Sequence, residues 1–347
     1  MRPKSSLFAR VPVLSLAMTA LAACGGSEPP PASQPTPAEQ APMPVVSAAP
    51  AASDSSAAAP APPPAAAGPA KPTPSLSLHD AGFQTPESVF YDAKDDVYLV
   101  SNINGGPSAA DGNGFISRVS PDGGKVELKW IEGGKKGVKL DAPKGLAAVG
   151  DTLYVADLTR VRMFDLATGK PRGEVALPGA TFANDLAAGP DGTVYASDSG
   201  IRIDDKGVTP TRSDAVYAVA KGKATKLAAG EDLGHPNGLL WSGDKDGKLW
   251  VVTFGSGELY WLDKAGKKND AQKLPKGSLD GVVALSDGSV LVSSWEGQEV
   301  LRGKPGGSWD VAIPGVKAPA DIGFDTKRGR VLVPLFQDSA VEAYDVK

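Results

Sequence analysis

Short apolar runs of strand length alternate with turns rich in Gly and Asp through most of the chain. β-Branched residues occupy these runs, and no apolar pattern occurs at helical spacing, so the chain is expected to be all-β. In one stretch, residues 184–188 and 193–197 are two expected strands joined by Gly189-Pro-Asp-Gly192, a turn in which Gly supplies a positive φ. After a longer loop, residues 215–219 and 224–228 supply two more strands. The repeating element is therefore a unit of four strands.

Six such units follow one another, and each opens with a four-residue phrase whose first residue varies within a constant frame. The phrases are Glu87-Ser-Val-Phe, Lys144-Gly-Leu-Ala, Asn184-Asp-Leu-Ala, Asn237-Gly-Leu-Leu, Asp280-Gly-Val-Val and Ala320-Asp-Ile-Gly. Their spacings are 57, 40, 53, 43 and 40 residues. A period of this size, built from short strands and Gly/Asp turns, predicts a six-bladed β-propeller of four-stranded blades.

The last unit reaches Lys347 without a fourth strand, whereas Leu76-Ser-Leu-His-Asp precedes the first phrase and belongs to no unit. We therefore expect this N-terminal strand to complete the sixth blade. Its pairing there would close the ring and remove an exposed sheet edge.

The N-terminus has the pattern of an export signal. Three basic residues precede an apolar run over residues 11–22 that is too short to span a membrane, and small residues follow it. Leu21-Ala-Ala-Cys24 resembles a bacterial lipobox, which implies a lipoprotein signal peptide at residues 1–23 and lipidation of Cys24. Gly25, in place of Asp, resembles Gram-negative lipoproteins of the outer membrane. The expected location is the cell envelope, with a lipid anchor in the outer membrane and the protein facing the periplasm.

Residues 24–75 consist almost entirely of small residues and Pro, with too few large apolar groups to offset the entropy of ordering them. We expect a disordered Pro/Ala-rich linker, stiffened towards polyproline II, before a propeller domain at residues 76–347. The formal net charge of −4 carries no basic excess, so nucleic acid is not an expected partner. The single cysteine excludes an internal disulfide framework. The expected partners are a small-molecule substrate and, through the N-terminal lipid only, a membrane, and the protein is expected to be a monomer.

Propeller symmetry places the six variable residues in a ring around the central channel. Four of them carry side-chain oxygens that can bind a metal: Glu87, Asn184, Asn237 and Asp280. Carboxylates and amides gathered at one point repel one another and leave lone pairs unsatisfied unless a cation lies between them. This set contains no Cys or His and favours Ca²⁺, or Mg²⁺ or Mn²⁺ with water completing the shell. The alternative is structural, because Asn and Asp are common at turn-to-strand junctions.

The phrases that carry these four residues resemble those of a known family. Pro86-Glu87, Phe182-Ala-Asn184-Asp185, Pro236-Asn237-Gly238 and Asp280-Gly281 are similar, in order and blade placement, to phrases of the senescence marker protein/gluconolactonase/luciferin-regenerating-enzyme family of six-bladed propellers. The resemblance covers about residues 76–347. It implies one divalent cation, Ca²⁺ or Zn²⁺, held by Glu87, Asn184, Asn237 and Asp280, and we expect Ca²⁺ in first place.

Two positions depart from this family. Its sugar lactonases usually have an Arg two residues before the first ring Asn, where it holds substrate hydroxyls, but Phe182 stands there and cannot donate a hydrogen bond. Lys144 heads the second blade and brings an ammonium to the mouth of the channel. It could clamp an anionic substrate or pair structurally with Asp157 or Asp198, and the sequence does not choose between these roles. The departures weaken the case for a sugar-lactone substrate.

Residues at the ends of the second strands return to the face on which the first strands begin. They are expected to line the substrate pocket together with Lys144 and Phe182, and they are Asn102, Asp157, Asp198, Phe254, Trp295 and Phe336. Aromatic walls with a few polar groups suit a small amphipathic ligand. Two long loops, residues 102–114 and 199–214, fall on the same face, and the first is a candidate mobile lid because it is rich in Gly and Asn.

Two functional hypotheses follow. The first is a lipid-anchored, divalent-metal-dependent hydrolase of the lactonase or esterase type that acts on a small periplasmic substrate. In it the cation polarises the carbonyl and activates a water, and Asp280 takes the proton as the catalytic base. The second is a non-catalytic propeller that serves as a binding or scaffold protein. Lys144 and Phe182 favour the second hypothesis, and the intact set of four oxygen ligands favours the first.

Overall fold

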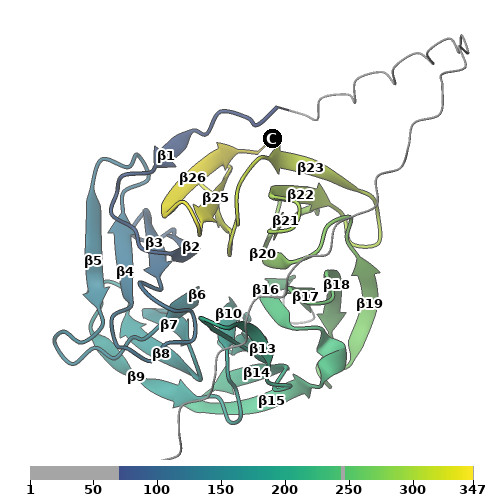
Figure 1. The fold of residues 1–347 in the computed structure, drawn as a ribbon, viewed down its shortest axis with the longest axis horizontal. Coiled ribbons are helices and arrows are strands. Elements are labelled where there is room, and N and C mark those ends of the chain that lie inside the picture. The colour runs from purple at the N-terminus through teal and green to yellow at the C-terminus, as the bar shows by residue number, and fades with distance from the viewer. Residues whose placement is uncertain (1–69, 244–246, 347) are drawn as a thin grey trace, which may run out of the picture. The chain divides into compact units, whose positions relative to one another are not determined.

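Six antiparallel sheets of four strands each surround a central axis in the computed structural model (Figure 1). The structure describes residues 70–243 and 247–346. These residues contain 26 strands and one 3₁₀ turn, Glu231–Leu233. The predicted all-β class and the six-bladed β-propeller are confirmed. The predicted signal peptide, the lipidated Cys24 and all but the last residues of the linker lie outside the described residues and stay predictions.

Four of the six blades are built from four consecutive strands, and in every blade the first strand listed lies next to the axis and the last at the rim (Figure 1). Blade 1 consists of β2 (Pro86–Asp92), β3 (Val97–Asn102), β4 (Phe115–Val119) and β5 (Val126–Glu132). Blade 2 consists of β6 (Pro143–Val149), β7 (Thr152–Asp157), β8 (Arg160–Asp165) and β9 (Pro171–Ala176). Blade 3 consists of β10 (Ala183–Ala188), β11 (Val194–Asp198), β14 (Ala215–Ala220) and β15 (Lys223–Ala229). A separate hairpin, β12 (Ile201–Asp204) with β13 (Gly207–Pro210), is inserted in its long loop.

The remaining blades follow the same plan. Blade 4 consists of β16 (Pro236–Ser242), β17 (Lys248–Thr253), β18 (Glu258–Leu262) and β19 (Lys268–Lys273). Blade 5 consists of β20 (Leu279–Ala284), β21 (Val290–Ser294), β22 (Glu299–Gly303) and β23 (Trp309–Pro314). Blade 6 consists of β24 (Gly323–Asp325), β25 (Arg330–Leu335) and β26 (Ala340–Asp345), with β1 (Leu76–Leu78) as its fourth strand.

The N-terminal strand closes the sixth blade, as predicted. β1 pairs antiparallel with β26, and Leu76 lies opposite Ala343. On β26, Glu342 accepts a hydrogen bond from Lys71 Nζ at 2.8 Å. Main-chain pairing between the two ends of the domain therefore completes the ring and covers the edge of β26.

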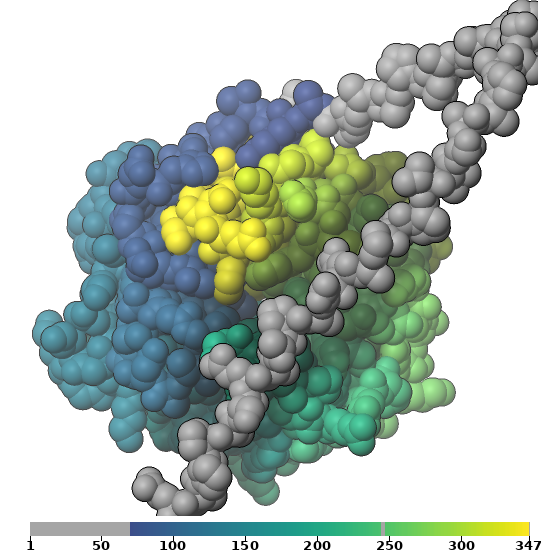
Figure 2. Space-filling view, viewed as in Figure 1, coloured from purple at the N-terminus to yellow at the C-terminus, as the bar shows by residue number. Residues whose placement is uncertain are grey.

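Hydrophobic packing lies between the blades and not on the axis. Six buried clusters each join two neighbouring blades. Leu99 and Leu153, for example, belong to the cluster between the first and second blades, and Tyr98 and Val341 to the cluster between the first and sixth. The space-filling view shows the blue N-terminal strands directly beside the yellow C-terminal ones (Figure 2). Because apolar surface is buried between the sheets, the centre is left for polar side chains.

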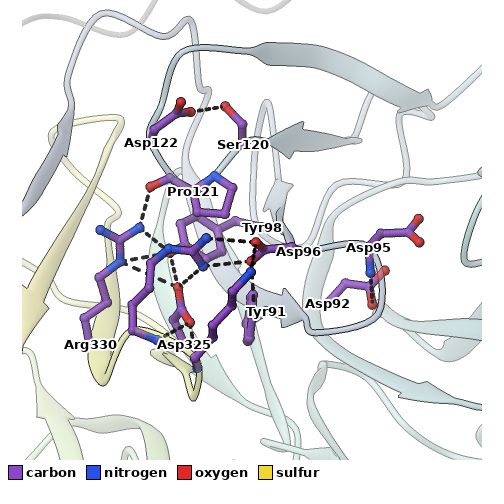
Figure 3. A network of polar contacts seen from close by, with 12 residues as sticks. Tyr91, Asp92, Asp95, Asp96, Tyr98, Ser120, Pro121, Asp122, Asp325 and Arg330 are labelled. Atoms are coloured by element: carbon purple, nitrogen blue, oxygen red, sulfur yellow. Dashed lines mark hydrogen bonds and ion pairs between the residues drawn. The ribbon is translucent and has the colours of Figure 1, made fainter.

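A polar network joins the first and sixth blades where the ring closes (Figure 3). Tyr98 donates its hydroxyl to Asp325 Oδ2 at 2.5 Å, and Arg330 Nε donates to the Tyr98 hydroxyl at 2.9 Å. Nearby, Arg328 Nη1 donates to Asp96 Oδ1 at 2.7 Å. Burial, reinforced by the bond to Asp325, raises the pKa of Tyr98, so its hydroxyl keeps its proton and stays a donor. This network adds side-chain contacts to the main-chain closure by β1.

Candidate metal centre

A β-bulge at the start of the inner strand frees the variable residue of five phrases from the sheet ladder. In blade 1, Pro86 pairs with Asn102 and the next pair is Val89 with Val100, so two residues between them are left out. These are Glu87 and Ser88, and the same shift leaves out Lys144-Gly145, Asn184-Asp185, Asn237-Gly238 and Asp280-Gly281. A bulge redirects side chains away from the regular alternation of the strand. It thereby lets the first residue of each phrase reach the site.

The freed residues line one cavity of about 250 Å³. Its polar members from the phrases are Glu87, Lys144, Asn184, Asn237 and Asp280. Their relative exposure is 1–5%, so each is almost completely buried. The sixth variable residue, Ala320, has no polar side chain. The structure therefore brings the four predicted metal ligands and Lys144 together in one place.

Each of the four predicted ligands has one buried oxygen without a hydrogen-bond partner: Glu87 Oε2, Asn184 Oδ1, Asn237 Oδ1 and Asp280 Oδ1. Other polar atoms of the set are engaged, since Asn184 Nδ2 donates to Ser199 Oγ at 3.0 Å and Trp295 Nε1 donates to Asp280 Oδ2 at 2.7 Å. A buried polar atom left unpaired costs about 1–3 kcal/mol, so four of them in one place need a common partner. Carboxylate and amide oxygens are the ligands that Ca²⁺ and similar hard cations prefer. The donor set fits such an ion.

Electrostatic repulsion among the carboxylates also favours a bound cation at this site. Burial, followed by the charges of Asp280 and Asp321, raises the pKa of Glu87 well above its usual value. Burial and Asp321 also raise the pKa of Asp280, which hydrogen bonds from Trp295 and Asn237 partly offset. A bound cation favours the ionised carboxylates and lowers these pKa values. Metal binding here is therefore expected to release protons.

A second carboxyl pair, Asp185 and Asp321, occupies the second position of the third and sixth phrases. The amide of Leu239 donates to Asp185 Oδ2 at 2.6 Å, and Ser88 Oγ donates to Asp321 Oδ2. Burial raises the pKa of Asp321 to about 7, and burial with the charge of Asp321 raises the pKa of Asp185 well above its usual value. The sequence analysis did not identify this pair. The signal was present, because the second residues of the phrases read Ser, Gly, Asp, Gly, Gly and Asp.

Lys144 is held by two backbone carbonyls and one aromatic ring. Its Nζ donates to Pro107 O and to Ala142 O at 3.0 Å each, and it lies 4.2 Å from the centroid of the Phe182 ring. Burial lowers the pKa of Lys144 to about 8, although attraction to Glu87 opposes the change. One of the three ammonium protons remains for a group in the cavity.

Three predicted pocket residues do not line the cavity. They are buried acceptors at the ends of second strands, and each binds a backbone amide just before the inner strand of its own blade. The pairs are Asn102 with the Gln84 amide, Asp157 with the Ala142 amide and Asp198 with the Phe182 amide, at 2.8–2.9 Å. The structure therefore places these three side chains outside the cavity lining, where their oxygens satisfy buried backbone donors. Within the described chain, neither Asp157 nor Asp198 forms an ion pair with Lys144, and Asp157 pairs with Arg162 Nε at 2.7 Å.

The predicted aromatic residues do line the cavity: Phe182, Phe254, Trp295 and Phe336. The ring centroids of Phe254 and Trp295 are 5.7 Å apart, and those of Trp295 and Phe336 are 5.0 Å apart. These three rings come from consecutive blades and form a continuous aromatic wall. Trp295 also orients Asp280 through its indole N–H, so the wall and the polar ring are linked.

Aliphatic residues that the sequence analysis did not single out complete the lining. Ile201, Ile203 and Val208 come from the β12–β13 hairpin, and the loop after β3 adds Ile103 and Pro107. The amide of Ile203 donates to the Ser108 hydroxyl at 2.9 Å, so the two long loops meet beside the cavity. The alternation Ile201-Arg-Ile-Asp inside the expected loop was the available signal for the hairpin.

Two further observations concern the described residues as a whole. Residues 70–243 and 247–346 include no helix that is long and apolar enough to cross a membrane. Within the same ranges, no group of three or more His, Cys, Asp and Glu side chains is positioned to hold a metal ion. The ring described above differs in composition, because it combines two carboxylates with two amides.

A family model matches this sequence over residues 85–333, and it is described as the SMP-30/Gluconolactonase/LRE-like region. The match covers more than half of the chain and includes all four predicted ligands of the ring. The chain belongs to this family. Membership agrees with the resemblance of the phrases around Glu87, Asn184, Asn237 and Asp280. Among curated protein sequences, none matches this SMP-30/gluconolactonase-like chain.

Several solved structures share the fold of this SMP-30/gluconolactonase-like chain. A gluconolactonase from Xanthomonas campestris matches with a TM-score of 0.58 and 20% identity, over 77% of this chain and 87% of that one. Regucalcin, a calcium-binding protein from Agrobacterium tumefaciens, matches with a TM-score of 0.54 and 17% identity, over 78% of this chain and 93% of that one. A catalytically inactive virginiamycin B lyase from Staphylococcus aureus matches with a TM-score of 0.53 and 15% identity, over 78% of this chain and 98% of that one. At these identities the likeness shows the fold alone.

Proposed function

We propose that this protein is a divalent-metal-dependent hydrolase of the lactonase or esterase type that acts on a small periplasmic substrate. The observation that carries the proposal is the set of four buried, unpartnered oxygens in a member of the gluconolactonase-like family. Glu87, Asn184, Asn237 and Asp280 would hold the cation, for which Ca²⁺ is our first choice and Zn²⁺, Mg²⁺ and Mn²⁺ are alternatives. When bound, such a cation supplies a Lewis acid for an ester carbonyl and lowers the pKa of water.

Asp280 is the proposed catalytic base. The hydrogen bond from Trp295 Nε1 holds its Oδ2, which leaves Oδ1 free of protein partners. A carboxylate held in this way beside the cation can take a proton from an adjacent water with little reorganisation.

The other cavity residues would bind and orient the substrate. Asn184 and Asn237 present amide oxygens from adjacent blades, and Lys144 offers its remaining ammonium proton to negative charge on the substrate or product. The aromatic wall of Phe254, Trp295 and Phe336 excludes water from the reacting groups.

We also propose that the protein is a monomeric lipoprotein that faces the periplasm from the outer membrane. The lipobox-like segment that ends at Cys24 supports this location, and the Pro/Ala-rich linker supplies a spacer to the propeller. Cys24→Ser should prevent lipidation and release the protein from membranes into the soluble fraction. Membrane retention of that variant would contradict the lipid anchor.

The hydrolase proposal is tested with metal-free protein and single cations. Protein stripped with EDTA is assayed for lactone and ester hydrolysis after addition of Ca²⁺, Mg²⁺, Mn²⁺ or Zn²⁺, and activity is expected only with a cation. Asp280→Asn should lower kcat by about 10²-fold or more and weaken cation binding, while the exposed control Asp338→Asn changes neither. Full activity in metal-free buffer would refute the proposal. Stabilisation by a cation without hydrolysis would favour the non-catalytic binding protein.

A further inference from the structure

The cavity has two chemically different parts, a polar floor made by the ring residues and an apolar wall around it. From this division we infer that the substrate is an apolar ester or lactone, which carries an alkyl or aryl group and not a set of hydroxyls beside the scissile carbonyl. The inference rests on the proposed hydrolase function and specifies its substrate class.

The wall is built from two apolar arcs that come from different parts of the chain. Phe254, Trp295 and Phe336 form the aromatic arc from blades 4, 5 and 6. Ile201 and Ile203 on β12 and Val208 on β13 form an aliphatic arc from the hairpin inserted in blade 3. Burial of an alkyl or aryl group between these arcs removes apolar surface from water on both sides.

The wall has no free hydrogen-bonding side chain for a substrate hydroxyl. Apart from the ring residues, only Trp295 and Ser199 carry polar side-chain atoms among the lining residues. Trp295 Nε1 is used by Asp280, and Ser199 Oγ donates to Pro236 O at 2.8 Å while it accepts from Asn184 Nδ2. Hydroxyls of a polyol would therefore lose water without gaining partners in the wall.

Two other features also favour a substrate with few hydroxyls. Phe182 presents an aromatic ring where a donor would be needed to hold hydroxyls, and that ring already contacts Lys144. Lys144 donates two of its three ammonium protons to backbone carbonyls, so it can donate a hydrogen bond to one oxygen of the substrate and not to several. The polar floor thus suits a single ester or carboxylate group.

The cavity also limits the size of the apolar group. Its volume of about 250 Å³ is slightly below the range of about 300–1,000 Å³ that is usual for ligand pockets. A six-membered lactone with a short alkyl chain is a small ligand that suits such a site. Val208 is 60% exposed and belongs to the lining, so a chain that extends past the hairpin would cover it.

The inference is tested with two δ-lactones that share the scissile bond. The metal-loaded protein is assayed with δ-octalactone and with glucono-δ-lactone, and spontaneous hydrolysis is subtracted. We expect kcat/KM for δ-octalactone to be about 10- to 100-fold higher, because unpaired hydroxyls in an apolar pocket give discrimination of this order. Equal values, or a preference for glucono-δ-lactone, would overturn the inference.

Variants of the hairpin test whether the aliphatic arc is responsible. A double variant with Ile203→Ser and Val208→Ser should lower kcat/KM for δ-octalactone at least fivefold and leave that for glucono-δ-lactone within twofold. The matched control is Val311→Ser, because Val311 is an exposed valine (38%) on β23 outside the cavity lining. An equal loss for both lactones, or no loss for δ-octalactone, would remove the hairpin from substrate recognition and overturn this part of the inference.

A binding measurement separates failure of the inference from failure of the hydrolase proposal. If neither lactone is hydrolysed with any of the four cations, calorimetry with the unreactive lactams 6-propylpiperidin-2-one and gluconolactam follows. Tighter binding of the propyl lactam would uphold the apolar ligand class although the protein is not a hydrolase. Tighter binding of gluconolactam, equal binding, or no binding of either would overturn the inference.

Discussion

Lys144 Nζ lies 4.2 Å from the centroid of the Phe182 ring. These two residues are the positions at which the sequence departs from the pattern of the family's sugar lactonases, and the fold places them in contact. An aromatic face attracts the ammonium, whereas an Arg at position 182 would put two cations side by side in a buried place. The two departures therefore form one structural unit.

This contact predicts a coupled effect of substitutions at the two positions. Phe182→Arg alone should destabilise the protein because it replaces attraction by repulsion next to Lys144. With Lys144→Met in the same chain, the destabilisation should be at least partly relieved, with a coupling energy of about 1 kcal/mol or more. Urea unfolding of the two single variants and the double variant measures this energy, and additive effects would contradict the prediction.

Calcium stabilisation should increase with pH. Without metal, the raised carboxyl pKa values in the centre mean that the folded state binds more protons than the unfolded state between the usual carboxyl range and about pH 7. Stability of the metal-free protein then falls as pH rises through this window. Because a bound cation keeps the carboxylates ionised, it removes this loss. The Ca²⁺-induced rise in Tm should grow from pH 5 to pH 8, and a rise that is largest at pH 5 would speak against metal binding by these groups.

Asp321 should account for part of that pH dependence. The pKa of Asp321 is raised to about 7 from 3.8, and one such group contributes a slope of about 1.4 kcal/mol per pH unit. Asp321→Asn keeps an acceptor for Ser88 Oγ but cannot titrate. In metal-free unfolding experiments from pH 4 to pH 7, its slope should be shallower by about that amount. The exposed Asp338→Asn serves as the control, and an unchanged slope for Asp321→Asn would contradict the assignment.

Gly145 should not tolerate a side chain. A Cβ at this position would lie 2.3 Å from Asp185 Oδ1 and 2.5 Å from Asp185 Cα, so backbone would have to move. Gly145→Ala should therefore destabilise the protein by about 1–3 kcal/mol and weaken cation binding through displacement of the neighbouring Asn184. In Gly124→Ala the nearest atom would lie at 3.4 Å, so that variant should unfold like the wild type. Equal stability of the two variants would contradict the packing argument.

Removal of the N-terminal strand should weaken the whole propeller. Deletion of residues 75–83 removes the β1–β26 pairing and the buried side chains of Leu76 and Phe83. The loss of one such side chain alone costs about 2–5 kcal/mol, so we expect Tm to fall by about 5 °C or more. The exposed edge of β26 should also promote self-association, measurable by light scattering. A truncated protein that melts like the intact one would contradict closure by β1.

The side chains predicted to line the pocket differ in what they contact. Asn102, Asp157 and Asp198 end second strands, as expected, but the fold uses their oxygens for backbone amides. Trp295 lies one residue beyond the equivalent position of blade 5, which is Ser294, and it reaches Asp280. Successive residues of a strand point to opposite faces. This offset of one residue therefore separates a side chain that serves the fold from one that serves the cavity.

Strand period, turn chemistry and the repeated phrase are local properties, so the sequence alone determined the all-β class, the six blades, the closing N-terminal strand and the identity of the four oxygen-bearing ring residues. The tertiary structure decided what depends on distant segments meeting. It placed the bulge that frees Glu87 and its counterparts, brought Asp185 to Asp321, and set the β12–β13 hairpin beside the aromatic wall. Hydrogen-bond partners and desolvation arise only when these segments pack, and they are what convert a ring of polar residues into a site that fits a cation.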